Sequence, residues 1–196
     1  SGVHAIGQVA NFRIEADINI YKFKHSLNSF LPSDIVVKNI MQVNPEAHCR
    51  FDAVTREYNY YIYRQKDPFL KETAFYFPYK LDIDLMQQAA AIVKEYTDFT
   101  SFSKRNTQVK TFICQIQESN WLFQDKTLIY NVKSNRFLRG MVRALTATML
   151  KIGRDKLSLQ QFRHIIEAKD CTKASFAVPA HGLFLIKVNY DKGFNK

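Results

Sequence analysis

The sequence contains few of the residues that usually mark linkers, disulfide frameworks or metal sites. Only six glycines and five prolines occur among 196 residues, so no linker between two domains is evident. The three cysteines, Cys49, Cys114 and Cys171, lie far apart and form no Cys-x-x-Cys pair. This spacing argues against a disulfide framework and against a zinc site, and it is consistent with a reducing cytosol.

Several signatures of catalysis and of membrane insertion are also missing. The sequence has no Gly-x-x-x-x-Gly-Lys-Ser/Thr, no Gly-x-Gly-x-x-Gly and no His-Glu-x-x-His, so nucleotide-dependent, dinucleotide-binding and zincin activities lack support. The five histidines show no metal-ligand spacing, and we expect His164 to be a surface residue. No apolar run approaches the roughly 18 residues of a membrane-spanning helix. We therefore expect no metal site and no membrane segment.

Positive charge and aromatic rings are what the sequence has in excess. Lys and Arg number 28 against 18 Asp and Glu, a net charge of +10, and the chain carries 10 Tyr and 16 Phe. Such a charge suggests an anionic partner, nucleic acid first and an anionic membrane second. Tyrosines at a surface can stack on bases. An ordinary basic enzyme is the alternative interpretation.

Hydrophobic periodicity predicts both strands and helices. The expected strands span residues 7–15, 34–43, 50–64, 111–121, 127–133 and 182–190. The expected helices span residues 18–30, 84–96 and 134–153, and a last one begins at a capping box of Ser158 and Gln161. Strands and helices alternate irregularly. This pattern predicts an α+β fold, one domain over residues 1–196, with an antiparallel or mixed sheet and helices packed on one face.

Two groups of residues combine cations with apolar or aromatic neighbours. Arg136, Arg139 and Arg143 lie in "SNRFLRGMVRAL", and at 100° per residue one helix would bring them to nearly the same face. That face needs water or an anionic partner. Arg56 and Tyr58 share a face of the 50–64 strand, where they either form a surface site or pack as an ordinary cross-strand pair.

Six stretches agree with one known family. In chain order they read "SGVHAIGQVANF", "LPSDI", "RFDAVTREYNYYIY", "DFTSF", "NRFLRGMVRAL" and "AVPAHGLFLIKVNY". Together they resemble the tRNA pseudouridine synthase A family from Ser1 to about Tyr190. The resemblance implies a pseudouridine-synthase-like fold and a cytoplasmic isomerase that needs no cofactor. Such an enzyme detaches uracil from ribose in the anticodon stem-loop of tRNA, turns it and rejoins it through C5. It also implies a homodimer.

The resemblance further implies a catalytic aspartate outside the 196 residues. In the family, Gly-Arg-Thr-Asp precedes the stretch that matches "SGVHA", and its aspartate is the nucleophile. That aspartate would stand just before Ser1. We therefore expect residues 1–196 to be the C-terminal catalytic and RNA-binding portion, without the family's N-terminal half-domain. We expect this portion alone to be inactive.

Residue by residue, the resemblance assigns roles to the matching positions. Tyr58 matches the tyrosine that lies against the flipped base, and Arg143 of Met-Val-Arg matches the arginine that pairs with the aspartate. The expected apolar wall of the base pocket is Leu138, Met141, Leu183 and Leu185. The expected RNA-phosphate contacts are Arg50, Arg56, Arg136 and Arg139. Ser101 and Phe102 match a family segment to which we assign no role.

Gly140 is the one departure within the arginine motif, and inside a helix a glycine costs about 1 kcal/mol relative to alanine.

Two rival functions stay open at this point. A non-catalytic RNA-binding module could keep the fold, the basic face and the aromatics, and the residues encoded before Gly2 would distinguish it from the enzyme. A membrane-binding scaffold would need a basic amphipathic helix with exposed aromatics, and we expect none.

Overall fold

A computed structural model describes residues 2–105 and 108–191 of the chain. The chain divides into two compact units. The larger unit comprises Ser1–Gln8 and Val54–Asn189, and the smaller comprises Val9–Ala53 and Tyr190–Lys196. Each is described by itself below. That residues 1–196 fold as one domain stays a prediction, because this division does not test whether either unit folds alone.

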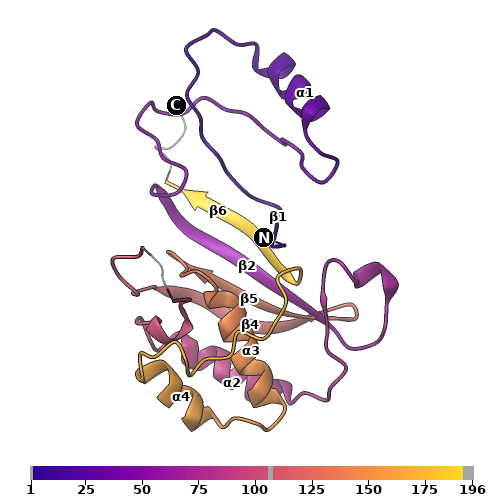
Figure 1. The fold of residues 1–196 in the computed structure, drawn as a ribbon, viewed down its shortest axis with the longest axis vertical. Helices are drawn as coiled ribbons and strands as arrows, with labels where there is room; N and C mark the ends of the chain where they lie inside the picture. The colour runs from indigo at the N-terminus through magenta and orange to yellow at the C-terminus, as the bar shows by residue number, and fades with distance from the viewer. Residues whose placement is uncertain (1, 106–107, 192–196) are drawn as a thin grey trace. The chain divides into compact units, whose positions relative to one another are not determined.

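The larger unit is built on a mixed sheet (Figure 1). Its described strands are β1 (His4–Ala5), β2 (Ala53–Tyr63), β3 (Phe75–Tyr76), β4 (Ile116–Gln124), β5 (Thr127–Ser134) and β6 (Leu183–Tyr190). The order is β1-β6-β2-β5-β4, with β3 beside the end of β2. β1 runs parallel to β6 and β3 parallel to β2, whereas β5 is antiparallel to both β2 and β4. A tight turn joins the antiparallel pair β4 and β5, since Asp125 takes a left-handed φ of 53° between them.

Three helices of the larger unit cover one face of this sheet (Figure 1). They are α2 (Ile83–Val93), α3 (Met141–Gly153) and α4 (Leu159–Glu167). The core between them and the sheet holds Tyr60, Tyr130, Met86, Leu145 and Phe162, all fully buried. The predicted α+β architecture, a mixed sheet with helices on one face, is confirmed. No helix within residues 2–105 and 108–191 is long and apolar enough to cross a membrane.

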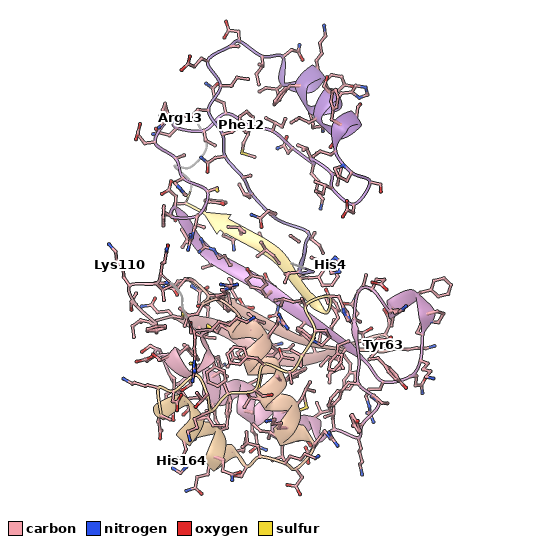
Figure 2. All side chains as sticks on the ribbon, in the orientation of Figure 1. His4, Phe12, Arg13, Tyr63, Lys110 and His164 are labelled. Carbon is pink, nitrogen blue, oxygen red and sulfur yellow. The ribbon has the colours of Figure 1, made fainter. Side chains whose placement is uncertain are left out.

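Local sequence signals explain where these helices begin. The Asp82 carboxylate accepts a hydrogen bond from the Leu85 amide, which satisfies one free donor at the start of α2. At α4 the predicted capping box is confirmed, because Ser158 and Gln161 each accept from the other's backbone amide. α4 then buries Phe162 and Ile166. His164 lies on the outer side of this helix and is exposed, as expected (Figure 2).

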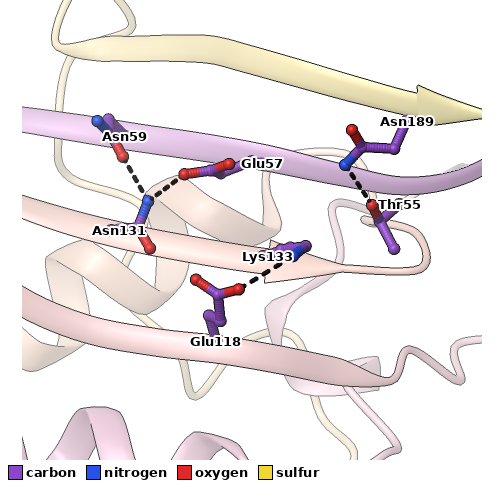
Figure 3. A network of polar contacts seen from close by, with 7 residues as sticks. All are labelled: Thr55, Glu57, Asn59, Glu118, Asn131, Lys133 and Asn189. Atoms are coloured by element: carbon purple, nitrogen blue, oxygen red, sulfur yellow. Dashed lines mark hydrogen bonds and ion pairs between the residues drawn. The ribbon is translucent and has the colours of Figure 1, made fainter.

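Side chains of β2, β5 and β6 on the sheet face that points away from the helices form polar contacts (Figure 3). Asn131 Nδ2 donates to Glu57 Oε1 and to Asn59 Oδ1, both at 2.8 Å. Asn189 Nδ2 donates to Thr55 Oγ1 at 2.8 Å, which links β6 to β2. These contacts satisfy half-buried polar groups that face away from the helices. The alternation predicted for residues 50–64 is therefore confirmed in β2.

The smaller unit contains the predicted helix but neither predicted strand. α1 (Ile20–Phe30) begins at Asn19, whose side chain accepts from the Lys22 amide. The strand predictions for residues 7–15 and 34–43 are wrong, because neither segment is extended into a ladder. Within residues 34–43 only Val43 makes a single bridge, so neither segment gains the row of hydrogen bonds to a neighbour that holds a strand. Phe12, Ile14 and Val36 are exposed.

The helix predicted over residues 134–153 begins later than expected. α3 starts at Met141, and the preceding Gly140 has a φ of 82° in the left-handed region. A right-handed helix cannot continue through this conformation. Arg136 and Arg139 therefore lie in the loop before α3, and only Arg143 lies on the helix, so the prediction of one shared helix face is wrong. Gly140 is favoured by its φ and does not cost the helix stability.

The other element bounds differ from the predictions only at their ends. Gly153 is the last residue of α3 and Arg154 is the C-cap, so the predicted cap is one residue early. A Cβ on Gly153 would lie 2.4 Å from Sδ of Met86, which explains the glycine by the close packing of α3 on α2. β4 begins at Ile116, later than the predicted residue 111, and before it Ile113 makes only an isolated bridge to Asp98.

Candidate active site

The segment 178–182, just before β6, is held in place by a buried side chain of β2 and a half-buried side chain of α3. Arg143 donates from both Nε and Nη2 to the Val178 carbonyl oxygen, at 2.9 and 2.6 Å. Tyr60 donates its hydroxyl hydrogen to the Pro179 carbonyl oxygen at 2.8 Å. A Cβ on Gly182 would lie 2.8 Å from Cζ of Tyr60. The backbone here passes so close to the Tyr60 ring that only glycine fits.

The first described residues of the chain lie beside the same segment. Gly2 has a φ of 69°, and a Cβ on it would lie 3.4 Å from Cβ of Ala180. β1 follows directly and pairs with β6, His4 with Phe184. The His4 ring stacks on the Phe184 ring with centroids 4.5 Å apart. Gly2 thus lies beside Ala180, two residues after Val178, whose carbonyl oxygen the Arg143 guanidinium binds.

Tyr58 lies on the same face of β2 as Tyr60, two residues nearer the start of the strand. Its ring meets the Phe137 ring edge-on, with centroids 5.1 Å apart. Burial raises the pKa of the Tyr58 hydroxyl, and the nearby Arg56 guanidinium offsets only part of this effect. Tyr58 is therefore protonated at neutral pH. Its hydroxyl can donate a hydrogen bond and its ring can take part in stacking.

Tyr60 is a site residue for which the sequence analysis proposed no role. Its side chain is fully buried. Burial raises the pKa of its hydroxyl, and Arg143 partly offsets this, so Arg143 and Tyr60 are electrostatic neighbours. The available signal was its position two residues after Tyr58 on the same strand face. Its partner, a backbone carbonyl, leaves no trace in a sequence.

The four residues expected to wall the base pocket are all buried. Leu138 and Met141 precede and begin α3, with 4% and 0% of their surface exposed. Leu183 and Leu185, on β6, are each 7% exposed. Leu138, Met141 and Leu183 belong to the hydrophobic core of the larger unit. Tyr58 packs against this core, and the contact of the four leucine and methionine side chains with a base stays a prediction.

Of the four predicted phosphate-binding arginines, two lie on the loop before α3, and a third lies on β2 and bonds to that loop. Arg56 Nη1 donates to the Asn135 carbonyl oxygen at 2.9 Å, which ties β2 to the loop before α3. Arg136 is half-buried and Arg139 is exposed on the same loop. Arg50 belongs to the smaller unit, where its guanidinium lies 5.7 Å from the centroid of the Phe51 ring.

Ser101 and Phe102, which the sequence left without a role, are structural. They lie in the short helix η2 (Thr100–Phe102), and both are fully buried. Ser101 Oγ accepts a hydrogen bond from the Asp170 amide at 2.9 Å, which fastens η2 to the turn after α4. Phe102 packs edge-on against Phe162 of α4. No group of three His, Cys, Asp or Glu residues that could hold a metal ion occurs in the described ranges.

Comparisons with known proteins agree with the sequence motifs. A family model described as tRNA pseudouridine synthase matches residues 96–191. A protein from Parabacteroides distasonis named tRNA pseudouridine synthase A is 45% identical over 98% of this chain and 77% of its own length. Proteins of the same name from Bacteroides fragilis and Bacillus subtilis are 43% and 37% identical, over 98% and 97% of this chain and 77% and 78% of their own lengths.

Proposed function

The chain belongs to the tRNA pseudouridine synthase A family, and on that premise we propose that Tyr58, Arg143 and the 178–182 segment form the centre that isomerises uridine to pseudouridine in tRNA. One observation carries this proposal. Arg143 and Gly2 are 141 positions apart in sequence, yet Arg143 binds the Val178 carbonyl and Gly2 lies beside Ala180, two residues further along the same short segment.

Arg143 is suited to hold the aspartate that the family resemblance expects just before Ser1. A guanidinium carries five N–H donors, and the Val178 carbonyl accepts two of those of Arg143, from Nε and Nη2. The remaining donors can form a bidentate pair with a carboxylate. A guanidinium that is paired with a carboxyl group in this way lowers the pKa of that group and keeps it ionised. The Val178 contact fixes the direction in which the guanidinium points.

In the proposed reaction the uridine leaves the helical stack, which costs a few kcal/mol. The C1′–N1 bond breaks, the uracil turns, and a C1′–C5 bond forms. The proton on C5 is then lost and N1 gains one, so substrate and product are isomers. The Tyr58 hydroxyl is protonated at neutral pH, and burial raises its pKa further; Tyr58 lies against the base and takes part in moving the proton. Stacking on an aromatic ring contributes about 1–3 kcal/mol per base.

The remaining predicted residues complete the proposed interface. We assign Leu138, Met141, Leu183 and Leu185 to the apolar wall against the base. We assign Arg50, Arg56, Arg136 and Arg139 to phosphate groups of the RNA. The proposal includes uridines on the 3′ side of the anticodon stem-loop as substrates, a homodimer as the active state and the cytoplasm as location. No cofactor takes part in it.

Tritium release tests this proposal, because forming the C1′–C5 bond expels the hydrogen on C5. Transfer RNA carrying 5-tritiated uridine is incubated with the 196-residue chain and with a longer product that includes the expected aspartate. We expect release by the longer product alone. Release by neither, together with tRNA binding by both, would contradict catalysis and favour a non-catalytic RNA-binding module.

A further inference from the structure

A cavity of about 400 Å³ lies between η2 and the turn that follows α4. Its polar lining includes Lys104, Arg105, Lys169, Asp170 and Cys171. None of these residues was singled out as a ligand contact by the sequence, and none belongs to the centre described above. We call it the Lys104 cavity.

Asp170, which lines the cavity, and Asp98, which pairs with the lining residue Lys169, already have partners. The Asp98 carboxylate accepts from the Thr100 amide and hydroxyl at 3.0 and 2.7 Å, and it pairs with Lys169 Nζ at 3.0 Å. Desolvation raises the pKa of Asp98, but the hydrogen bonds from Thr100 and Lys169 outweigh it and lower the pKa. The Asp170 carboxylate accepts from the amide and hydroxyl of Thr172. Both carboxylates are therefore ionised, and each already accepts hydrogen bonds from the partners named here.

The cations at the cavity are less fully paired. Lys104 forms no ion pair with any carboxylate in residues 2–105 and 108–191. Arg105 likewise forms no ion pair with a carboxylate in these residues. The Cys171 thiol, which lines the same cavity, is the main cause of the raised pKa of the Arg105 guanidinium, and the Asp170 charge adds a smaller effect. A thiol is a poor acceptor for a guanidinium, which prefers two oxygens of a carboxylate or phosphate. The cavity thus presents two cationic side chains without an oxygen partner of matching geometry.

The Lys104 cavity is also adjacent to the proposed catalytic centre. The Lys104 amide donates to the Arg139 carbonyl oxygen at 2.9 Å. A Cβ on Gly140 would lie 3.1 Å from Cγ of Lys104, so Lys104 packs on the left-handed turn that starts α3. Arg143 lies in the first turn of that helix. The cavity and the exposed Arg139 side chain are therefore neighbours on the surface of the larger unit.

We propose that the Lys104 cavity binds a phosphate group of the RNA strand, through the Lys104 ammonium and the Arg105 guanidinium. This inference rests on the proposed function, because it takes RNA as the source of the phosphate. Arg105 supplies two parallel N–H donors to phosphate oxygens and Lys104 a point charge. Lys169 stays paired with Asp98 and closes the side of the cavity.

The first test measures tRNA binding against salt concentration. The variant is Lys104→Gln with Arg105→Gln, and the matched control is Lys126→Gln with Lys156→Gln, two exposed lysines of the same unit that do not line the cavity. Loss of one phosphate contact should reduce the slope of log K against log salt by about 0.7–0.9. We also expect roughly tenfold weaker binding, because hydrogen bonds to charged groups are lost. The control should match the wild type in slope.

The second test uses Cys171 as a reporter inside the cavity. Alkylation by iodoacetamide is followed on the peptide that carries Cys171, with no ligand, with tRNA or with inorganic phosphate. We expect tRNA to slow alkylation in the wild type and in the control, but not in the Lys104→Gln, Arg105→Gln variant. Protection by inorganic phosphate without protection by tRNA would overturn the inference, because the cavity would then take a free anion.

The two tests separate failure of this inference from failure of the proposed function. An unchanged salt slope in the variant, with tritium release intact in the longer product, would overturn the phosphate site and leave the function standing. Absence of both tRNA binding and tritium release would overturn the function and this inference together.

Discussion

The contact between Arg143 and the Val178 carbonyl makes a quantitative prediction for Arg143→Ala. The carbonyl belongs to a residue that is 3% exposed, and Arg143 reaches it with two donors at 2.9 and 2.6 Å. A hydrogen bond from a charged donor contributes about 1.5–3 kcal/mol. Arg143 is only half-buried, so solvent screens part of this. We expect Arg143→Ala to lower the free energy of unfolding by about 2–3 kcal/mol.

Arg143→Lys separates the charge from the geometry. Lysine keeps the positive charge but has a single ammonium, so it cannot donate from two fixed positions to one oxygen. We expect it to recover about half of the loss. Arg139→Ala is the matched control, because the Arg139 side chain is exposed, and it should stay within about 0.5 kcal/mol of the wild type.

Urea unfolding of the 196-residue chain measures these changes. The fluorescence of Trp121, the single tryptophan, reports on the larger unit, because its ring is 6% exposed and packs on Tyr130. The reasoning would be refuted if Arg143→Ala and Arg139→Ala unfolded at the same urea midpoint. Such a result would mean that the 178–182 segment keeps its position without Arg143.

Four further predictions concern Tyr58, Arg139, Gly140 and Cys114. Tyr58→Phe in the longer product should bind tRNA normally but release tritium far more slowly, and unchanged release would remove the hydroxyl from the chemistry. Arg139→Ala should reduce the salt slope of tRNA binding by about 0.7–0.9, and an unchanged slope would separate Arg139 from phosphate. Gly140→Ala should destabilise the chain by about 1–2 kcal/mol, because alanine resists the left-handed φ of 82°; a gain in unfolding free energy would contradict this. Burial raises the pKa of the Cys114 thiol from about 9 to about 11, and Arg136 offsets a part of this effect. The buried neutral thiol therefore contributes its full stabilisation below pH 9, and this contribution to the free energy of unfolding is lost as the pH rises toward 11. Iodoacetamide at pH 8 should therefore label Cys171 in the folded chain, and Cys114 only after urea unfolds it.

The strands and helices that the sequence predicted correctly are those with a local signal. The alternation of residues 50–64 marks β2, and the Ser158 and Gln161 capping box marks the start of α4. Residues 7–15 have a similar alternation and residues 34–43 are rich in β-branched side chains, but neither segment forms a strand. Alternation shows which side chains would share a face of a strand. A strand also needs hydrogen bonds to a neighbouring backbone, and that neighbour can be far away in sequence, so a local pattern does not reveal it.

The arginine loop shows a second limit of sequence reasoning. Helical spacing placed Arg136, Arg139 and Arg143 on one face, yet the left-handed backbone at Gly140 starts a new element between them. A glycine flanked by leucine, arginine and methionine is compatible with either outcome. Here the packing of Gly140 against Lys104 and Phe176 accompanies the left-handed turn.

The sequence names residues of the candidate site but not their contacts. Tyr58 and Arg143 come from motifs, and the structure puts them on β2 and α3 of the same unit. The partners of Arg143 and Tyr60 are the backbone carbonyls of Val178 and Pro179. Every residue has a carbonyl, so no residue type in the sequence identifies such an acceptor.

The central claim is that Arg143 belongs to a centre that isomerises uridine. Its most direct test is tritium release from 5-tritiated tRNA by the longer product and by its Arg143→Ala and Arg139→Ala variants, at tRNA concentrations that saturate each protein. We predict release by the wild type and by Arg139→Ala, and no release by Arg143→Ala. Equal release by Arg143→Ala and the wild type would contradict the assignment of Arg143 to the catalytic centre.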